Sequence, residues 1–191
     1  MSGSNKADVL TATKSRTVDT ALELFSAHGV SGTSLQMIAE QLGVTKAAIY
    51  HQFKSKDEIV IAVTETIMGP LEAASLRAEA QPTPQKRRQS LVGDLVDQAV
   101  KQRKVAGLLQ RDPYIGKLFS EYDRFSHIMG LMNSLLVGPK DIAEARVTAA
   151  LILTSIGGTV MHPMVAEVDD ETLRNQLWDL ADGLVRKLNK L

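Results

Sequence analysis

The sequence predicts an all-α fold, and three observations support this. Apolar residues recur at helical spacing through almost all of the 191 residues. Alternating β-branched and aromatic runs, which mark strands, are missing, and aromatic residues make up only 4% of the chain. Capping residues, glycines and prolines separate the apolar runs into successive helices.

The composition excludes several classes of protein. The chain has 22 Lys and Arg against 22 Asp and Glu, four His and no Cys. The lack of cysteine excludes disulfides, thiolate zinc sites and cysteine-ligated iron–sulfur clusters. The formal net charge of zero excludes a basic coat over the whole surface. Any nucleic-acid binding must therefore come from a local patch.

The N-terminal region predicts a tail followed by a helix. Residues 1–10 are expected to be a disordered tail. A helix is expected over residues 13–28, because its apolar residues Val18, Ala21, Leu22 and Phe25 share one face. Gly29 suits the left-handed conformation that ends a helix.

Two short helices are expected next, one from Thr33 or Ser34 to about Leu42 and one over residues 45–53. Thr33 with Gln36 reads as a capping box, and Thr45 is a good N-cap. Between the helices, Ala39 permits close approach and Gly43 permits a left-handed turn. The apolar positions expected to face the core are Ile38, Leu42, Val44 and Ile49. This spacing favours a helix-turn-helix over a plain packing hairpin.

The following helix is apolar on almost every side. Ser55 and Glu58 form a second capping box at its start. Its apolar residues continue to Ile67, so it should be buried between layers. Gly69-Pro70 is expected to kink or break it, and residues 81–84 read as a linker.

The C-terminal half predicts four further helices. A helix follows residue 84, Asp112-Pro113 marks a break, and the next helix is expected over 116–136. The last two are expected over 139–161 and 170–191. Residues 147–166 carry no charged side chain and are long enough to span a bilayer, but only 12 of these 20 are apolar. A buried helix is the better interpretation. With no signal peptide visible, we expect a cytoplasmic protein without a membrane segment.

Residues 32–57 resemble a known signature. The matching positions are Gly32-Thr33-Ser34, Ile38-Ala39, Gly43-Val44-Thr45, Ile49-Tyr50, Phe53 and Ser55-Lys56-Asp57. This pattern resembles that of TetR-family transcriptional regulators. The resemblance implies a three-helix DNA-binding domain over 11–56 and a helical domain over 57–191 for effector binding and dimerisation. It also implies a repressor that a small apolar ligand releases from a pseudo-palindromic operator, and no cofactor.

The expected contacts with double-stranded DNA come from the helix-turn-helix. Residues 33–56 hold three lysines against Glu40 alone, a local net charge of +2. Lys46 is placed to reach a guanine edge or a phosphate, and the alanines allow close approach to thymine methyl groups. Tyr50 and His51 resemble the phosphate-contacting pair of the family. The full set of expected DNA-binding residues is Thr33, Gln36, Thr45, Lys46, Ala47, Ala48, Tyr50, His51 and Lys56.

The C-terminal helices suggest a homodimer and an effector site. A leucine stripe on the last helix is the expected dimer interface: Leu173, Leu177, Leu180, Leu184 and Leu188. An apolar pocket needs a few orienting polar groups. The candidate ligand-binding residues are Tyr122, Phe125, His127, Met129, Met132, Asn133, Thr154, Ser155 and His162.

The sequence bears on two other functional classes, an enzyme and a module without an effector. Catalytic motifs such as GxSxG, the P-loop and HExxH do not occur, and no two histidines have metal-ligand spacing. We therefore expect no enzyme, no catalytic residue and no metal site. The remaining alternative is a DNA-binding or protein-interaction module on the same fold that has no small-molecule effector.

Overall fold

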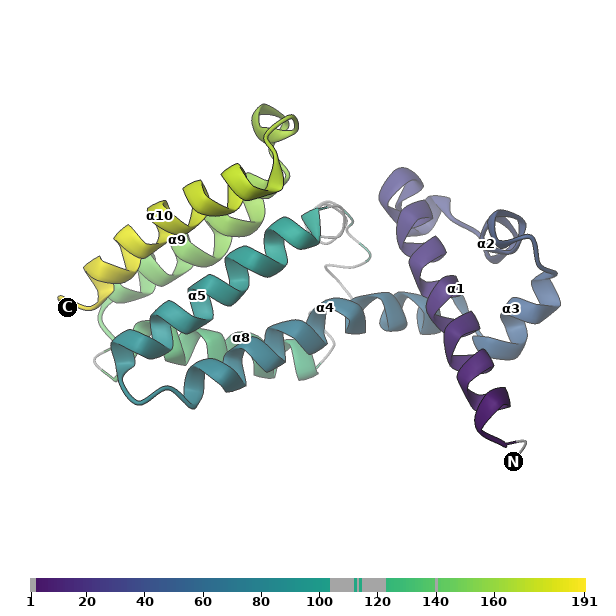
Figure 1. The fold of residues 1–191 in the computed structure, drawn as a ribbon, viewed down its shortest axis with the longest axis horizontal. Helices are drawn as coiled ribbons and strands as arrows, with labels where there is room; N and C mark the ends of the chain where they lie inside the picture. The colour runs from purple at the N-terminus through teal and green to yellow at the C-terminus, as the bar shows by residue number, and fades with distance from the viewer. Residues whose placement is uncertain (1–2, 104–111, 113, 115–122, 140) are drawn as a thin grey trace. The chain divides into compact units, whose positions relative to one another are not determined.

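The computed structural model describes residues 3–103, 112, 114, 123–139 and 141–191. Within these ranges the chain is helical and contains no strand, so the predicted all-α class is confirmed (Figure 1). The helices are α1 (Gly3–Gly32), α2 (Leu35–Leu42), α3 (Lys46–Gln52), α4 (Lys56–Glu79), α5 (Pro84–Lys101), α8 (Asp123–Val137), α9 (Ala143–Val160), the short 3-10 helix η1 (Pro163–Val165) and α10 (Asp170–Leu188).

The chain divides into two compact units. Of the described residues, unit 1 holds 3–67 together with Asp112 and Tyr114, and unit 2 holds 68–103, 123–139 and 141–191. Helix α4 contributes its first half to unit 1 and its second half to unit 2. Unit 1 thus reaches beyond residue 56, where the sequence placed the boundary.

Unit 1 is built from α1, α2, α3 and the start of α4. Phe25, Ile38, Ile49 and Phe53 are each at most 2% exposed and fill its core. Two positions expected in this core lie outside it, because Leu42 is half-buried and Val44 is 40% exposed. Both belong to the end of α2 and its turn, where the chain leaves the packed face.

Helix α1 differs from the expected helix at both ends. It begins at Gly3, so residues 3–10 are helical where a tail was expected. No proline occurs before Pro70, so nothing in this region obliges the helix to start later. The expected stop at Gly29 is present as a kink with φ 73°, after which helical structure continues to Gly32.

Helix α4 continues through Gly69-Pro70, so the expected break is wrong. The helix runs from Lys56 to Glu79 with Pro70 inside it. Met68 on one side of the pair and Ala74 on the other are each at most 1% exposed. Packing on both sides therefore outweighs the backbone hydrogen bond that proline cannot donate.

Among the described helices, α4 is the one long and apolar enough to cross a membrane by length and composition. Of its most apolar 18-residue window, 44% is buried inside the molecule. A core helix of a soluble protein passes the same test.

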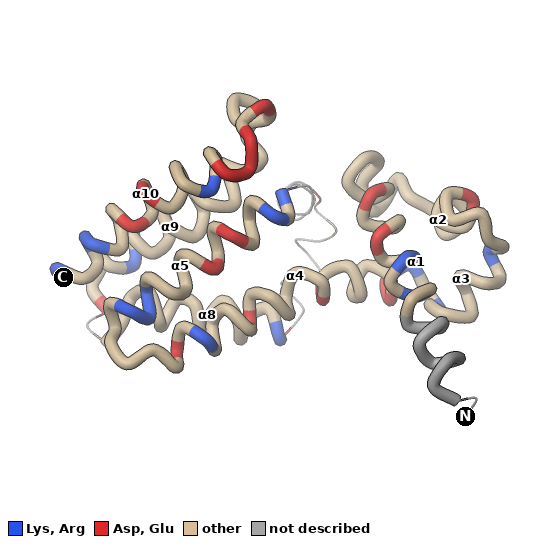
Figure 2. Tube along the Cα trace, viewed as in Figure 1, with Lys and Arg blue, Asp and Glu red and all other residues tan. Residues whose placement is uncertain are grey.

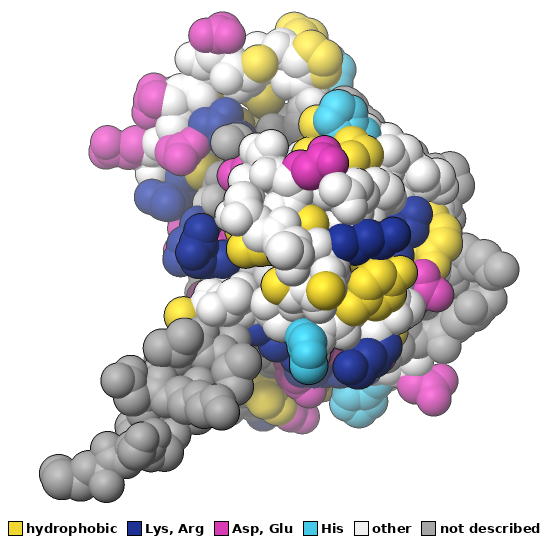
Figure 3. Space-filling model, turned by 90° about the vertical axis from the view of Figure 1, so that its right-hand side faces the viewer, with side chains coloured by type: hydrophobic (Ala, Val, Ile, Leu, Met, Phe, Trp, Pro, Cys, Tyr) yellow, Lys and Arg dark blue, Asp and Glu magenta, His cyan; other side chains and the backbone are white. Residues whose placement is uncertain are grey.

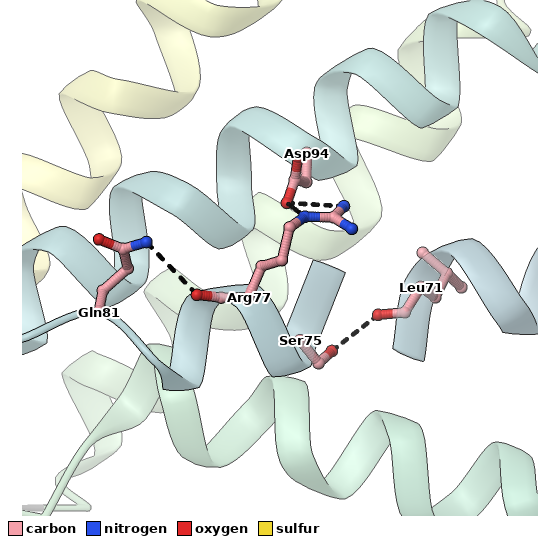
Figure 4. Close-up of polar contacts among 5 residues, drawn as sticks. All are labelled: Leu71, Ser75, Arg77, Gln81 and Asp94. Carbon is pink, nitrogen blue, oxygen red and sulfur yellow. Dashed lines mark hydrogen bonds and ion pairs between the residues drawn. The ribbon is translucent and has the colours of Figure 1, made fainter. Parts of the chain in front are cut away.

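Unit 2 packs α5, α8, α9 and α10 together with the second half of α4. Helix α10 lies along α5 and α9, and α8 packs against α5 and α9. At the turn between α4 and α5, Arg77 pairs with Asp94 at 3.1 Å, and Gln81 donates to the Arg77 carbonyl (Figure 4). Buried Ser75 donates to the carbonyl of Leu71 at 2.9 Å, so its hydroxyl is satisfied within α4.

One buried arginine joins three helices of unit 2. Arg88, in the first part of α5, is 8% exposed, and burial lowers its pKa from the usual value. Its guanidinium donates to the carbonyl of Leu136 at 2.8 Å, the carbonyl of Leu188 at 3.3 Å and the side-chain oxygen of Asn189 at 2.9 Å. The carbonyls at a helix C-terminus carry partial negative charge, so the ends of α8 and α10 stabilise this cation.

Candidate nucleic-acid interface

Helices α2 and α3 form the predicted helix-turn-helix. Gly43 ends α2 in the left-handed conformation, with φ 67°, and the Val44 N–H donates to the Ala39 carbonyl at 3.0 Å. Thr45 then caps α3, because its hydroxyl accepts the Ala48 N–H at 3.2 Å. Ala39 is 1% exposed, as expected for a small residue where two helices approach closely. The turn between the helices is therefore short and anchored at both ends.

Helix α3 presents one face to solvent. Its buried side is held by Ile49, which is fully buried. Lys46, Ala47 and His51 are exposed, Tyr50 is 44% exposed and Ala48 is half-buried. Figure 3, which views unit 1 from the side of α2 and α3, shows basic and histidine side chains interleaved with hydrophobic ones.

The charge on this face has one sign along α3. Residues 41–56 contain three lysines and no acidic residue. The Lys46 ammonium lies 5.7 Å from the centre of the Tyr50 ring, within the range of a cation–π contact. The Lys54 ammonium donates to the Tyr50 carbonyl at 3.4 Å. A cationic surface with an exposed aromatic ring is suited to phosphate oxygens and base edges.

Two residues predicted to contact DNA are engaged within the chain. Thr33 is 2% exposed, and its hydroxyl lies 3.2 Å from the Leu24 carbonyl and 2.9 Å from the Gly29 carbonyl. Its hydroxyl is thus engaged within the chain, and a contact of Thr33 with DNA stays a prediction. The Lys56 ammonium donates to the carbonyls of Val30 at 2.8 Å and Thr33 at 3.2 Å, so it ties α4 to the end of α1.

The capping of α2 also differs from the expected pattern. Ser34, one residue later than Thr33, caps the helix by accepting the Met37 N–H at 3.2 Å. Gln36 is exposed and donates to Glu40 at 2.7 Å, so it does not close a capping box. The second predicted box is formed at its start, because Ser55 accepts the Glu58 N–H at 3.2 Å.

Asp112 and Tyr114 contribute to unit 1, although no sequence pattern predicted this. Asp112 accepts the Val30 N–H at 2.6 Å beside the kink at Gly29. The Tyr114 hydroxyl donates to Asp57 at 2.5 Å, near the start of α4. These contacts join residues far apart in sequence, which no local pattern reveals.

The candidate ligand-binding residues do not come together as a set. Tyr122 lies outside the described residues. On α8, Met132 is buried, while Phe125 and Met129 are half-buried. The polar candidates are all exposed: His127, Asn133, Thr154, Ser155 and His162. Exposed groups do not orient a ligand enclosed within one chain, so an effector site at these residues stays a prediction.

Three of the five leucines predicted at the dimer interface are part of the core of unit 2. Leu173, Leu177 and Leu188 are at most 5% exposed in the single chain, so they have little surface left for a second copy. Leu180 is 71% exposed and Leu184 is half-buried. On α9, within the uncharged segment 147–166, Val147 and Leu151 are 61% and 52% exposed.

No group of three or more His, Cys, Asp or Glu side chains with the geometry of a metal site occurs in the part of the chain that the structure describes.

Comparison with known proteins places this arrangement in context. The family model described as "Bacterial regulatory proteins, tetR family" matches residues 18–63, which span most of α1, α2, α3 and the start of α4. The chain is 45% identical over 60 residues to the HTH-type transcriptional regulator SrpR of Pseudomonas putida, covering 31% of this chain and 28% of SrpR. The first curated relatives are thus matched over less than half of their own length.

Two longer similarities extend beyond the helix-turn-helix. The HTH-type transcriptional regulator BetI of Rhizobium meliloti is 31% identical over 150 residues, which cover 71% of each chain. Among solved structures, the ketosteroid transcriptional regulator KstR2 of Mycobacterium tuberculosis aligns with a TM-score of 0.71 at 16% identity. That alignment covers 90% of this chain and 93% of KstR2, and it shows a shared fold.

Proposed function

Because the chain belongs to the TetR family of bacterial regulatory proteins, we propose that it is a transcriptional regulator that binds a DNA operator through α3. The observation that carries this proposal is the exposed, acid-free face of α3, with Lys46, Tyr50 and His51 accessible and Ile49 buried. An α-helix fits the major groove, where a lysine reads guanine and an alanine methyl contacts the thymine methyl.

The residues of α3 divide into two roles in this proposal. Lys46, Ala47 and Ala48, at the start of the helix, face base edges and supply sequence discrimination. Tyr50 and His51 hydrogen-bond phosphate oxygens and fix the position of the helix. Thr45 acts mainly by capping α3, which holds the helix in the conformation that the groove accepts.

We propose that the protein acts as a homodimer in the cytoplasm. A second copy would bury the apolar surface of α9 and α10, where Val147, Leu151 and Leu180 are each more than half exposed. Two helix-turn-helix units then read a pseudo-palindrome whose half-sites lie one helical turn apart, roughly 34–36 Å. Repression follows when the bound dimer occupies a promoter.

We further propose that a small apolar effector releases the dimer from DNA. Phe125, Met129 and Met132 on α8 supply an apolar surface for it. Helix α4 runs without a break from unit 1 into unit 2, so a ligand bound in unit 2 has a continuous element through which to act. A coupling of roughly 1–3 kcal/mol gives about 5- to 150-fold release.

The alternative is a regulator of the same fold without an effector. The exposure of the five polar candidates favours it, because these groups do not converge on an enclosed ligand. A thermal-shift screen of apolar metabolites separates the two: the effector proposal expects a compound that raises the melting temperature and weakens DNA binding. If no compound does both, the effector-free alternative holds.

In vitro selection tests the DNA-binding proposal. Purified protein is used to enrich duplexes from a random pool, and the enriched sequences are read. We expect a pseudo-palindrome, and we expect the Lys46→Ala variant to enrich a less defined sequence at one position in each half-site. A pool that stays random after repeated rounds at low salt would contradict sequence-specific binding.

A further inference from the structure

Helix α1 carries a basic position directly beside the end of α3. The Lys14 ammonium lies 5.1 Å from the centre of the Phe53 ring, and Phe53 is the residue at which α3 ends. One turn further along α1, the Thr17 hydroxyl lies 3.1 Å from the side-chain oxygen of Gln52. The N-terminal half of α1 is therefore fixed against the C-terminal end of the recognition helix.

The charges of unit 1 are unevenly distributed along α1. Residues 9–18 hold Lys14 and Arg16 and no acidic residue, whereas Asp19 and Glu23 follow toward the C-terminal end. Figure 2 shows this change from basic to acidic positions along the helix. The acid-free part of α1 adjoins the acid-free stretch 41–56, so the two form one cationic surface through the contacts at Phe53 and Gln52.

Lys14 has no carboxylate partner among the residues that the structure describes. It is exposed, and among the described residues it forms no ion pair with a carboxylate. Its ammonium lies over the ring of Phe53, which is 2% exposed, so the side chain is positioned by a cation–π contact and no carboxylate neutralises its charge. Such a lysine is suited to bind a phosphate without a cost for breaking an existing ion pair.

We propose that Lys14 is a phosphate-contacting residue that extends the DNA interface from the helix-turn-helix onto α1. This inference rests on the proposed function, since it requires that α3 binds DNA. Its ligand is the sugar–phosphate backbone beside the groove that α3 enters. A backbone contact positions the protein and carries no sequence information, so Lys14 strengthens binding to all duplexes alike.

Arg16 provides a matched control on the same helix. It is also exposed and forms no ion pair within the described part of the chain, but its position two residues later rotates it by about 200° around the helix from Lys14. Lys14 shares a face with Val18 and Ala21, which pack into unit 1, and Arg16 lies on the opposite side. The two cations therefore contribute the same net charge from different places.

The test measures how the binding of a mixed-sequence duplex of 30 base pairs depends on salt concentration. The variants are Lys14→Met, which removes the charge and keeps an unbranched side chain, Lys14→Arg, which keeps the charge, and Arg16→Met. For Lys14→Met we expect the slope of log K against log salt to fall by about 0.9 per chain. Lys14→Arg and Arg16→Met should keep a slope close to that of the unsubstituted protein.

Three results would overturn the inference. An unchanged slope for Lys14→Met means that its ammonium contacts no phosphate. An equal loss for Arg16→Met means that only net charge matters. A structural role is indicated if Lys14→Met lowers both the melting temperature and the affinity for DNA, and if Lys14→Arg restores neither of them. If the unsubstituted protein binds no duplex at low salt, the proposed function itself fails, which is a separate outcome.

Discussion

Lys46, the first residue of α3, and Lys56, the first residue of α4, have different partners. The Lys46 ammonium rests over the Tyr50 ring at the protein surface, whereas the Lys56 ammonium donates to two backbone carbonyls at the end of α1. We expect Lys46→Ala to weaken DNA binding without lowering stability. We expect Lys56→Ala to lower the free energy of unfolding by roughly 1–2 kcal/mol, because it removes two charge-assisted hydrogen bonds to the carbonyls of Val30 and Thr33. Urea unfolding followed by circular dichroism, with a parallel DNA titration, separates the two effects.

The reverse order of stabilities, with Lys46→Ala the less stable variant, would contradict this division of roles. At the residue scale, sequence patterns predicted the caps at Thr45 and Ser55 correctly, placed the cap of α2 one residue too early and predicted burial poorly. Thr45 was found because an N-cap acts on its own next turn. The burial of Thr33 was not predicted, because it depends on contacts with the carbonyls of Leu24 and Gly29 that the local sequence pattern does not reveal.

Arg88 is the side chain on which three helices of unit 2 converge. Replacing it with Met leaves the carbonyls at the ends of α8 and α10 without their donor, although it also removes a buried charge. We expect Arg88→Met to lower the free energy of unfolding by about 2–4 kcal/mol. The single tryptophan, Trp178, packs its ring against Gly93 of α5, so its fluorescence reports the unfolding of this unit.

A matched control for that prediction is Arg87→Met, the neighbouring substitution of the same type. Arg87 is half-buried and donates to one carbonyl, that of Gln81, at 2.9 Å. If the two variants unfold at the same urea concentration, the hydrogen bonds of Arg88 contribute no more to the free energy of unfolding than the single bond of Arg87.

The start of α10 gives the protein one pH-dependent contribution with a clear sign. The backbone N–H of Thr172 hydrogen-bonds to Asp169 at 2.9 Å, and this bond lowers the pKa of that carboxyl. The stabilisation is therefore complete above the ordinary aspartate pKa of about 3.9 and is lost as pH falls through the lower folded-state value. Asp169→Asn keeps a cap without the titration.

We accordingly expect the difference in unfolding free energy between the unsubstituted protein and Asp169→Asn to shrink as pH falls below about 4. Urea titrations at several pH values, followed by Trp178 fluorescence, measure it. A difference that grows on acidification would show that the carboxylate is not the stabilised form.

Helix α10 shows why an element can be predicted while its faces are not. Its position was predicted from the sequence, but the leucine stripe was interpreted as one seam. The buried face instead runs through Leu173, Leu177, Ala181, Val185 and Leu188. Ala181 and Val185 take the buried places, and the larger Leu180 points outward, because helical geometry rather than side-chain size sets the face.

The exposed apolar side chains of α9 and α10 carry the prediction for the whole molecule. We expect Leu151→Glu with Leu180→Glu to give monomers, since an unpaired carboxylate in a dry interface costs several kcal/mol. Light scattering at micromolar concentration measures the mass. Leu76→Glu is the control, because Leu76 is 55% exposed on α4 and lies outside the proposed interface.

A monomeric mass for the unsubstituted protein, or equal dissociation in Leu76→Glu, would contradict an interface on α9 and α10.

At the scale of the whole molecule, the sequence predicted two parts and their order, but not that Asp112 and Tyr114 belong with unit 1. Their contacts to Val30 and Asp57 cross more than 50 residues of chain, and no local periodicity encodes such a contact.

The central claim is that α3 reads DNA in two copies per site. The most direct measurement is a fluorescence-anisotropy titration of a selected pseudo-palindromic duplex, with stoichiometry, at one fixed salt concentration. We expect two chains to bind each duplex, with tighter binding than to a scrambled duplex of equal length. We expect Lys46→Ala to lose that preference. Equal affinity for the selected and scrambled duplexes, or an undiminished preference in Lys46→Ala, would contradict it.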